Sequence, residues 1–328
     1  MTAVRKGARM VDLAWLTWRQ HRWTIVVTAF AVAGYSAYLL VLRGDFVQVA
    51  CRNAGSCLNI GPAPQILVSF LLPLVSPVLA GIVGLFWGAP LLAREYEQRT
   101  HMLSWTQDVS STRWLLTRLA LLGSVVTVLS AGYGIAGTAL VRQIVAADHG
   151  RGFGGQYGPF TTTGFELWPP MQVVYALFGL ALGVAISAVT RRTVMAMGVT
   201  LAAFIAARVL IAVWARPIYL PPMRSTFPIG ERQPAFTGVD ILELRQGYLD
   251  KAGNPMSDAA ANDCFTSHPQ SPTISACERA HGIDRLFVDY QPADRLPLFH
   301  LIELGIFLAL SAGLLLLAWR LVRRAVSV

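Results

Sequence analysis

The sequence predicts an all-α, polytopic membrane protein with six transmembrane helices, and three observations support this fold class. Six apolar runs each have about the 20 residues that a helix needs to cross a bilayer. The chain is 54% hydrophobic and only 14% charged, with a mean hydropathy of +0.51, far from a soluble domain. The arginines that border the runs fall mostly on one side of the membrane. The runs are 23–42, 66–92, 115–141, 171–190, 194–215 and 298–319.

A basic, amphipathic segment, residues 1–22, precedes the first run. Trp15, Trp18 and the arginines near them suit a helix lying in the cytosolic headgroup layer, either as a simple anchor or as a partner-binding surface. A basic start before an apolar stretch is also typical of a secretory signal. The apolar stretch is too long for the core of a signal peptide, so we expect a retained first span.

The second run contains Pro73 and Pro77, which predict a kinked or tilted helix because each removes an intrahelical hydrogen bond. Small residues recur at four-residue spacing in runs one, two and four, and such faces allow close helix approach. Packing within the chain and a dimer seam both fit this pattern. The spaced residues are Ala29, Ala33 and Ala37, then Gly84 and Gly88, then Gly179 and Gly183.

Two further boundaries divide the chain. Only Arg191 and Arg192 separate the fourth and fifth runs, which predicts a tight hairpin. The segment 216–297 holds ten of the 18 prolines and is rich in polar turn residues, so we expect an extracytoplasmic subdomain of short helices or loops. Its clearest amphipathic stretch is 241–248. The predicted units are 1–22, 23–215 with a cytosolic loop at 93–113, 216–297, and 298–328 with a basic tail.

The distribution of Lys and Arg predicts the orientation, because cations are costly to move across the membrane during insertion. Fourteen lie in the termini and loops assigned to the cytosol, against four in the opposite short loops. The segment 216–297 carries eight more, but long segments translocate largely regardless of charge. Both termini are therefore predicted to be cytoplasmic. Because the net charge of +9 lies at membrane borders, it favours contact with lipid headgroups over nucleic-acid binding.

All four cysteines fall in segments predicted to lie outside, where an oxidising environment favours disulfides. The local pairs Cys51–Cys57 and Cys264–Cys277 close the shortest loops and so cost the least chain entropy. Other pairings and unpaired thiols stay open. We expect no metal site, since neither pair has a C-x-x-C spacing and only His268 and His281 lie near the second pair.

Catalytic signatures are missing from the sequence. It has no G-x-x-x-x-G-K-[ST] phosphate loop, no H-E-x-x-H and no G-x-S-x-G motif. The apolar runs hold no nucleophile matched with a base. We therefore expect no catalytic residue, no metal and no cofactor in this chain.

Two charged residues lie inside apolar runs at similar depth from the outer side. They are Arg208 in the fifth run and Glu303 in the sixth. Because charges inside a membrane tend to pair or to line a path, we expect an intramembrane ion pair between them. The alternative is that each side chain reaches the membrane surface separately.

The loop between runs two and three carries acidic, basic, aromatic and hydroxyl side chains together. It resembles the cytosolic coupling segment of ABC-2 type transporter permeases, in which an acidic pair, a Thr and a Leu precede a T-x-x-V-S turn into the third span. Arg99 stands where that family usually has Gly, and residues 86–95 look like its actinobacterial branch. The matching residues are Glu95, Glu97, Thr100, Leu103, Thr106, Val109 and Ser110.

This resemblance implies a multi-pass permease of the bacterial plasma membrane that exports a hydrophobic or amphipathic substrate and has no enzyme activity of its own. ATP and magnesium would be bound by a separate ABC ATPase, and the permease would pair with a second copy or a related permease. The implied contacts to the ATPase are Arg94, Glu95, Glu97, Arg99, Thr100, Leu103, Trp105, Thr106 and Val109, with Arg191 and Arg192 as a secondary contact.

A rival interpretation is a membrane receptor or accessory protein whose external subdomain, 216–297, binds a ligand without transport. It would explain the length of that subdomain but not the pattern of the loop. The sequence alone leaves open the substrate, the choice between a homodimer and a heterodimer, and the role of the subdomain.

Overall fold

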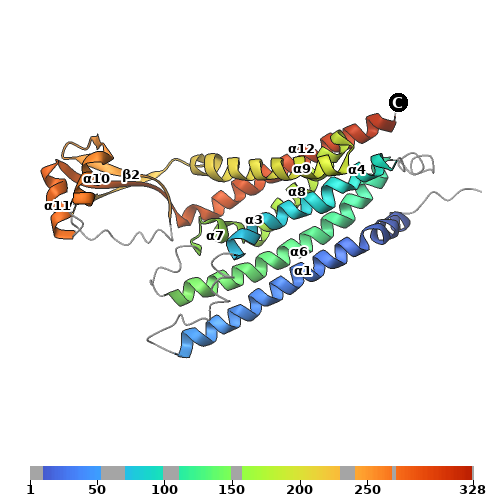
Figure 1. Cartoon of the computed structure of the whole chain (residues 1–328), viewed down its shortest axis with the longest axis horizontal. Coiled ribbons are helices and arrows are strands. Elements are labelled where there is room, and N and C mark those ends of the chain that lie inside the picture. The colour runs from blue at the N-terminus through green and yellow to red at the C-terminus, as the bar shows by residue number, and fades with distance from the viewer. Residues whose placement is uncertain are drawn as a thin grey trace, which may run out of the picture.

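The computed structural model describes residues 10–52, 71–98, 111–148, 157–229, 241–267 and 271–326. Long helices lie side by side along the long axis of the molecule, and a small mixed subdomain extends beyond one end (Figure 1). The C-terminus lies at the other end of the bundle.

Within the described residues, six helical segments are long and apolar enough to cross a membrane, which confirms the predicted number. Three of them are built from consecutive elements, and in the last of these a 3-10 turn at Ala293–Arg295 leads into α12. Helix α3 runs through a π-helical turn into α4, and α9 continues through a second π turn into a short 3-10 turn at Arg216–Ile218. The elements are α1 (Met10–Arg52), α3 (Leu72–Val83), the turn Gly84–Gly88, α4 (Ala89–Glu97), α6 (Ser111–Asp148), α7 (Thr162–Glu166), α8 (Pro169–Thr190), α9 (Thr193–Leu210), the turn Ile211–Ala215 and α12 (Leu296–Val326).

Helix α8 forms the centre of the bundle. In its most apolar stretch 72% of the residues are buried, against 22% in the corresponding stretches of α1, α9 and α12. It packs against α12, α6 and the α3–α4 helix. A helix that is apolar all round and almost free of charge suits this central place.

Glycines allow α8 to approach the α3–α4 helix closely. A methyl group added to Gly84 would lie 2.6 Å from the carbonyl oxygen of Gly179, and one added to Gly183 would lie 2.5 Å from the carbonyl oxygen of Gly84. Only glycine fits at such a crossing. Gly84, Gly88, Gly179 and Gly183 thus serve packing inside the chain.

The second span has its irregular turn later than the sequence suggested. Pro73 is at the second position of α3, where its missing N–H is not needed, and Pro77 lies within α3. The π-helical turn comes at Gly84–Gly88, directly before Pro90. Because Pro90 lacks an N–H and crowds the preceding turn, it accounts for the wider hydrogen bonding there.

Helix α1 is a single helix from Met10 to Arg52, so the segment expected as a separate interface helix is continuous with the first span. It packs along α6. Leu39 and Leu42 are buried in this contact, whereas Trp23 and Phe30 are exposed on the opposite surface.

The subdomain contains a sheet, so the expectation of short helices or loops is wrong for its central part. Four antiparallel strands lie in the order β1-β4-β2-β3. The stretch 241–248 belongs to β2, where Gly247 lies opposite Phe287 of β4. Pairing with a distant strand decided this element, and no local pattern reveals such a partner. The elements are β1 (Met223–Pro228), β2 (Ile241–Asp250), β3 (Pro255–Met256), α10 (Asp258–Ser267), α11 (Ser271–Ala280) and β4 (Ile283–Pro292).

The predicted disulfide Cys264–Cys277 is present and joins α10 to α11. For the other predicted pair, the Cys51 side chain and all of Cys57 lie outside the part of the chain that the structure describes.

Candidate functional site

The end of α4 and the start of α9 are joined by one carboxylate. The backbone N–H of Thr193 donates to Oε1 of Glu97 at 2.9 Å, and the Thr193 hydroxyl donates to Oε2 at 2.7 Å. Arg192, at the N-cap position of α9, gives no side-chain cap of its own. Glu97 therefore caps α9 from another helix, where a negative charge also complements the helix dipole.

The turn between α8 and α9 packs on the same end of α4. Its first residue, Arg191, has a left-handed backbone (φ 54°) and closes α8 through a hydrogen bond from its N–H to the carbonyl oxygen of Ser187. Its guanidinium lies 5.2 Å from the centre of the Tyr96 ring. The predicted hairpin is confirmed, and it contacts α4 through Arg191 and Thr193.

A second polar contact joins the same end of α4 to α6 and α1. Glu95 forms an ion pair with Arg118 at 3.0 Å, and Arg118 also donates to the side-chain oxygen of Gln20 at 2.6 Å. The Arg118 guanidinium lies over the Trp114 ring at 4.0 Å. Arg118 is buried, so three helices meet at one satisfied cation.

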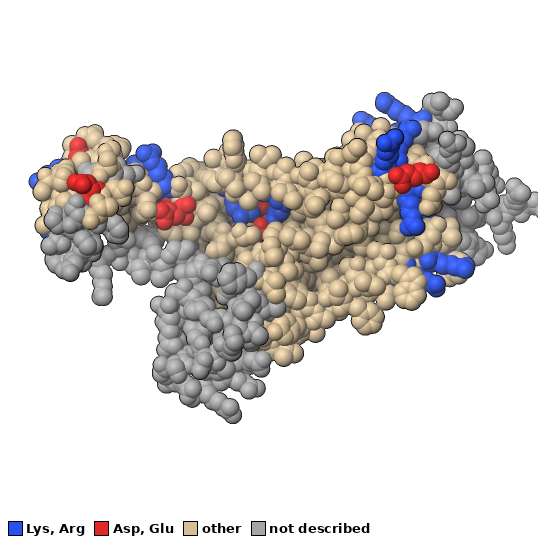
Figure 2. All heavy atoms as spheres, in the orientation of Figure 1, with Lys and Arg blue, Asp and Glu red and all other residues tan. Residues whose placement is uncertain are grey.

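We call these contacts at the end of α4 the corner site. Among the predicted coupling residues, the structure brings together Glu95, Glu97, Arg191 and Arg192 with the exposed Arg94. Figure 2 shows basic and acidic side chains gathered at this end of the bundle. The remaining predicted residues, Arg99, Thr100, Leu103, Trp105, Thr106 and Val109, lie outside the described residues.

At the other end of the bundle, Glu303 is fully buried and accepts several hydrogen bonds. Arg216 approaches it with Nε and Nη2, both at 3.0 Å, and the hydroxyl of Tyr175 donates at 2.6 Å. Arg208 lies 3.5 Å away through Nη1. The predicted pair Arg208–Glu303 is thus present, but it is the longer of two arginine contacts.

A second carboxylate completes this network. Arg208 also forms an ion pair with Glu166 of α7, so the charges alternate from Glu166 to Arg208 to Glu303 to Arg216. Both guanidinium groups lie over aromatic rings, Arg208 on Tyr175 and Arg216 on Phe165. Two acids and two bases neutralise one another, which lets four charged groups be buried together. We call these four residues the ionic network.

Sequence analysis missed Glu166, Arg216 and Tyr175 at this network. Glu166 and Arg216 lie just outside the apolar runs, where a charge needs no special explanation. A signal was available, because both border runs on the same predicted side as Arg208 and Glu303. Figure 2 shows a small mixed group of charged side chains in a depression midway along the molecule, surrounded by uncharged surface.

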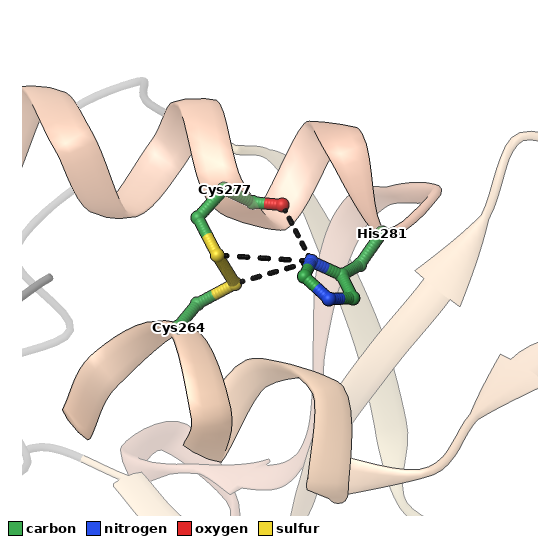
Figure 3. Close-up of side chains that lie close together, drawn as sticks. All are labelled: Cys264, Cys277 and His281. Atoms are coloured by element: carbon green, nitrogen blue, oxygen red, sulfur yellow. Dashed lines mark hydrogen bonds between the residues drawn. A yellow bond between two sulfur atoms is a disulfide. The ribbon is translucent and has the colours of Figure 1, made fainter. Parts of the chain in front are cut away.

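The subdomain contains a third cluster, shown in Figure 3. His281 lies beside the disulfide, with Nδ1 3.5 Å from Sγ of Cys264 and 3.7 Å from Sγ of Cys277. Its Nδ1–H donates to the carbonyl oxygen of Cys277 at 3.0 Å. The ring nitrogen of His281 and the Sγ atoms of the two cysteines lie within 4.8 Å of one another, close enough to bind one metal ion together. The two sulfurs are bonded to each other, however, and a metal needs them as thiolates.

Six spanning helices, a charged corner at one end and a buried ionic network at the other define a multi-pass membrane subunit. A family model described as ABC-2 membrane transporter related matches residues 24–216, and the chain belongs to that family. This match confirms the resemblance noted in the sequence. The chain has no significant match among curated protein sequences.

Family membership defines the general role of the chain. It is the permease of an ABC transporter, a multi-pass protein of the plasma membrane, and the family implies an ATPase partner. Permeases of this family are typically non-enzymatic transmembrane subunits, which do not bind cofactors themselves.

Proposed function

We propose that this permease is driven by a separate ATPase that docks on the corner site and on the loop 99–110, which follows α4 in the sequence. In this proposal both termini and the corner site lie in the cytosol, and ATP and magnesium stay with the partner. The observation that carries it is the contact between Glu97 and Thr193. This contact joins α4, which leads into the loop that resembles the coupling segment, to α9, which follows the turn at Arg191 and Arg192. A force on either segment would therefore move α4 and α9 together.

Helix α9 would transmit that force along the bundle. Its first residue, Thr193, is bound by Glu97, and Arg208 near its other end is bound in the ionic network. Thr193 and Arg208 are 15 positions apart, which corresponds to about 22 Å along a helix at ~1.5 Å per residue. A tilt of α9 would therefore change the arginine contacts of Glu303 on α12, which offers a way to alternate access on the two sides.

The lipid-exposed faces of the helices support an apolar or amphipathic cargo. Trp214 and Ile218 on the fifth span and Leu301 on the sixth are exposed, and charges within the spans are gathered in the ionic network. Such surfaces suit a substrate that enters from the bilayer. We also propose that this cargo is exported, and that the chain pairs with a second copy of itself or with a related permease.

The test is affinity purification from the host in mild detergent, followed by ATP hydrolysis measurements on the purified complex. An ATPase subunit should copurify, and the charge reversals Glu97→Arg with Arg99→Glu should release it. Lys251→Glu, a charge reversal in an exposed turn of the subdomain, is the matched control and should leave the complex intact. Transport by the chain alone in vesicles, independent of nucleotide, would rule the proposal out.

A second candidate function is ligand reception by the subdomain. A pocket of about 320 Å³ lies between the sheet and helices α10 and α11. Its polar lining suits a small ligand with hydrogen-bonding groups. Ligand binding there with no ATPase in the purified complex would favour this reception role over transport. The lining residues are Gln246, Gly247, Tyr248, Ala261, Asn262, Glu278 and Leu286.

A further inference from the structure

We propose that a pocket between α1, α4 and α6 binds the headgroup of an anionic phospholipid. The pocket has a volume of about 250 Å³ and shares Gln20, Arg94, Glu95 and Arg118 with the corner site. It is separate from the contact between Glu97 and Thr193, and the inference does not depend on the identity of the ATPase. The lining residues are Gln20, His21, Pro90, Leu91, Arg94, Glu95, Gln98 and Arg118.

The charges in the pocket favour an anion. Arg94 and Arg118 carry positive charge, and Glu95 is the single carboxylate in the lining. Glu95 is already paired with Arg118 at 3.0 Å. The Arg94 side chain is exposed and forms no ion pair with the described residues, so its charge is available to a ligand. A phosphate group accepts hydrogen bonds from guanidinium and amide N–H groups of this kind.

The fixed part of the pocket is already organised. Arg118 is held by Glu95, by Gln20 and by the Trp114 ring, so binding need not order this long side chain. A preorganised cation binds an anion at a lower entropic cost than a free one. Arg94 of α4 and Gln98, the C-cap residue of that helix, complete the polar part of the lining.

Tryptophans on α1 place the pocket at the level of lipid headgroups. Trp15, Trp18 and Trp23 are 59%, 44% and 71% exposed, and they border the lining residues Gln20 and His21 on the same helix. Exposed indoles gather at the membrane–water interface, where one side of the ring is apolar and the N–H meets water. Three of them within nine residues mark the interface on α1.

Part of the pocket lining is apolar, which explains why a lipid fits better than free phosphate. Pro90 and Leu91 belong to the spanning part of the α3–α4 helix, and they line the pocket together with the polar groups. A phospholipid offers a phosphate for the arginines and glycerol with acyl chains for this apolar part. Inorganic phosphate offers only the first.

The experiment measures lipid binding to the purified full chain in a nonionic detergent by native mass spectrometry. Phosphatidylglycerol and phosphatidylcholine with the same acyl chains are titrated in parallel, and inorganic phosphate is a third arm. We expect phosphatidylglycerol to bind more tightly than phosphatidylcholine. Arg94→Gln should weaken this binding about fivefold, the effect of one interfacial cation on an anionic lipid.

Two further variants make the result specific. Arg22→Gln removes an exposed cation that stacks on Trp23 outside the pocket lining, and it should leave the affinity for phosphatidylglycerol unchanged. Arg94→Lys keeps the charge and should retain most of the affinity. Equal binding of the two lipids, or equal effects of Arg94→Gln and Arg22→Gln, would overturn the proposal.

Two other occupants are distinguished by the same set of variants. If inorganic phosphate binds with the Arg94 dependence and phosphatidylglycerol does not, the pocket is a site for soluble phosphate and the lipid proposal fails. If Arg94→Gln leaves lipid binding unchanged but releases the ATPase, the pocket is a protein-docking site and the proposal also fails. Copurification of the ATPase is measured separately from lipid binding, so failure of the proposed function can be told apart from failure of the lipid proposal.

Discussion

Arg216 and Glu303 form a two-point ion pair at the base of the subdomain, with Nε and Nη2 of the arginine both 3.0 Å from the carboxylate. Arg216 lies where the chain leaves the fifth span for the sheet, and Glu303 lies two turns into α12, where the chain has returned. The pair therefore fastens together the two connections of the subdomain. A movement that separates these two connections must strain or open this contact.

Replacing Glu303 should destabilise the protein strongly. Glu303→Gln removes the charge that compensates Arg216 and Arg208, and leaving a buried charge unpaired costs about 3–5 kcal/mol. Thermal unfolding in detergent, followed by size-exclusion chromatography, should show a clearly lower midpoint. Glu243→Gln, at an exposed position on β2, is the control and should behave like the native protein. A native midpoint for Glu303→Gln would mean that the network contributes little to stability.

Loss of the cap on α9 should loosen the corner site locally. Glu97→Ala removes both hydrogen bonds to Thr193, and such a cap contributes about 1 kcal/mol. Hydrogen exchange of the first amides of α9 should become about fivefold faster, while exchange in the middle of α8 stays the same. Gln98→Ala changes the neighbouring exposed residue and should not affect α9. Unchanged exchange in Glu97→Ala would show that the hairpin holds α9 without this cap.

Close helix packing predicts an asymmetric response to glycine substitutions. A methyl group at Gly183 would lie 2.5 Å from a carbonyl oxygen of the α3–α4 helix, so Gly183→Ala should destabilise by about 1–3 kcal/mol. Gly313 of α12 has open space around the same position, and Gly313→Ala should be neutral or slightly stabilising. Comparison of the two unfolding midpoints is the measurement. Equal midpoints would contradict the close approach of α8.

The sequence predicted the spans well because hydrophobic length is a local property. All six apolar runs overlap spanning helices, and the hairpin at Arg191 and Arg192 was recognised from the two-residue gap. The Gly-x-x-x-Gly spacing also predicted close packing, although it did not identify the partner. Gly84 and Gly179 meet in the structure across a gap of 95 positions in the chain.

Long-range pairing explains what the sequence did not reveal. Glu97 was expected to face a partner protein, yet its carboxylate is bound to Thr193 of the same chain. Similarly, β2 was not predicted as a strand, because its partner, β4, begins 33 residues after β2 ends and follows two helices. In both places the contact joins parts of the chain that are far apart in the sequence. The local sequence around Glu97 or within β2 does not indicate the distant partner.

The salt bridge between Arg224 and Asp289 should make the subdomain sensitive to acid. Nε and Nη2 of Arg224 donate to the two carboxylate oxygens at 2.7 and 2.8 Å, and these hydrogen bonds lower the pKa of Asp289. A carboxyl with a lowered pKa in the folded state adds stability that is fully present above its unfolded value of about 3.9. That stability is lost as the pH falls through the lower folded value.

The measurement is the rate at which a water-soluble phosphine reduces Cys264–Cys277. Cys264 is fully buried and Cys277 is partly buried, so opening of the subdomain increases access to the disulfide. Arg224→Gln should be reduced faster than the native protein at pH 7, since it lacks the ion pair. Taking the ratio of the two rates cancels the effect of pH on the phosphine itself. Below about pH 4 the ratio should fall towards one, because protonation of Asp289 then favours the opened state, and the contribution is lost as the pH falls through the lowered folded pKa of Asp289. A ratio that stays constant from pH 7 to pH 3 would show that this pair does not hold the strands together.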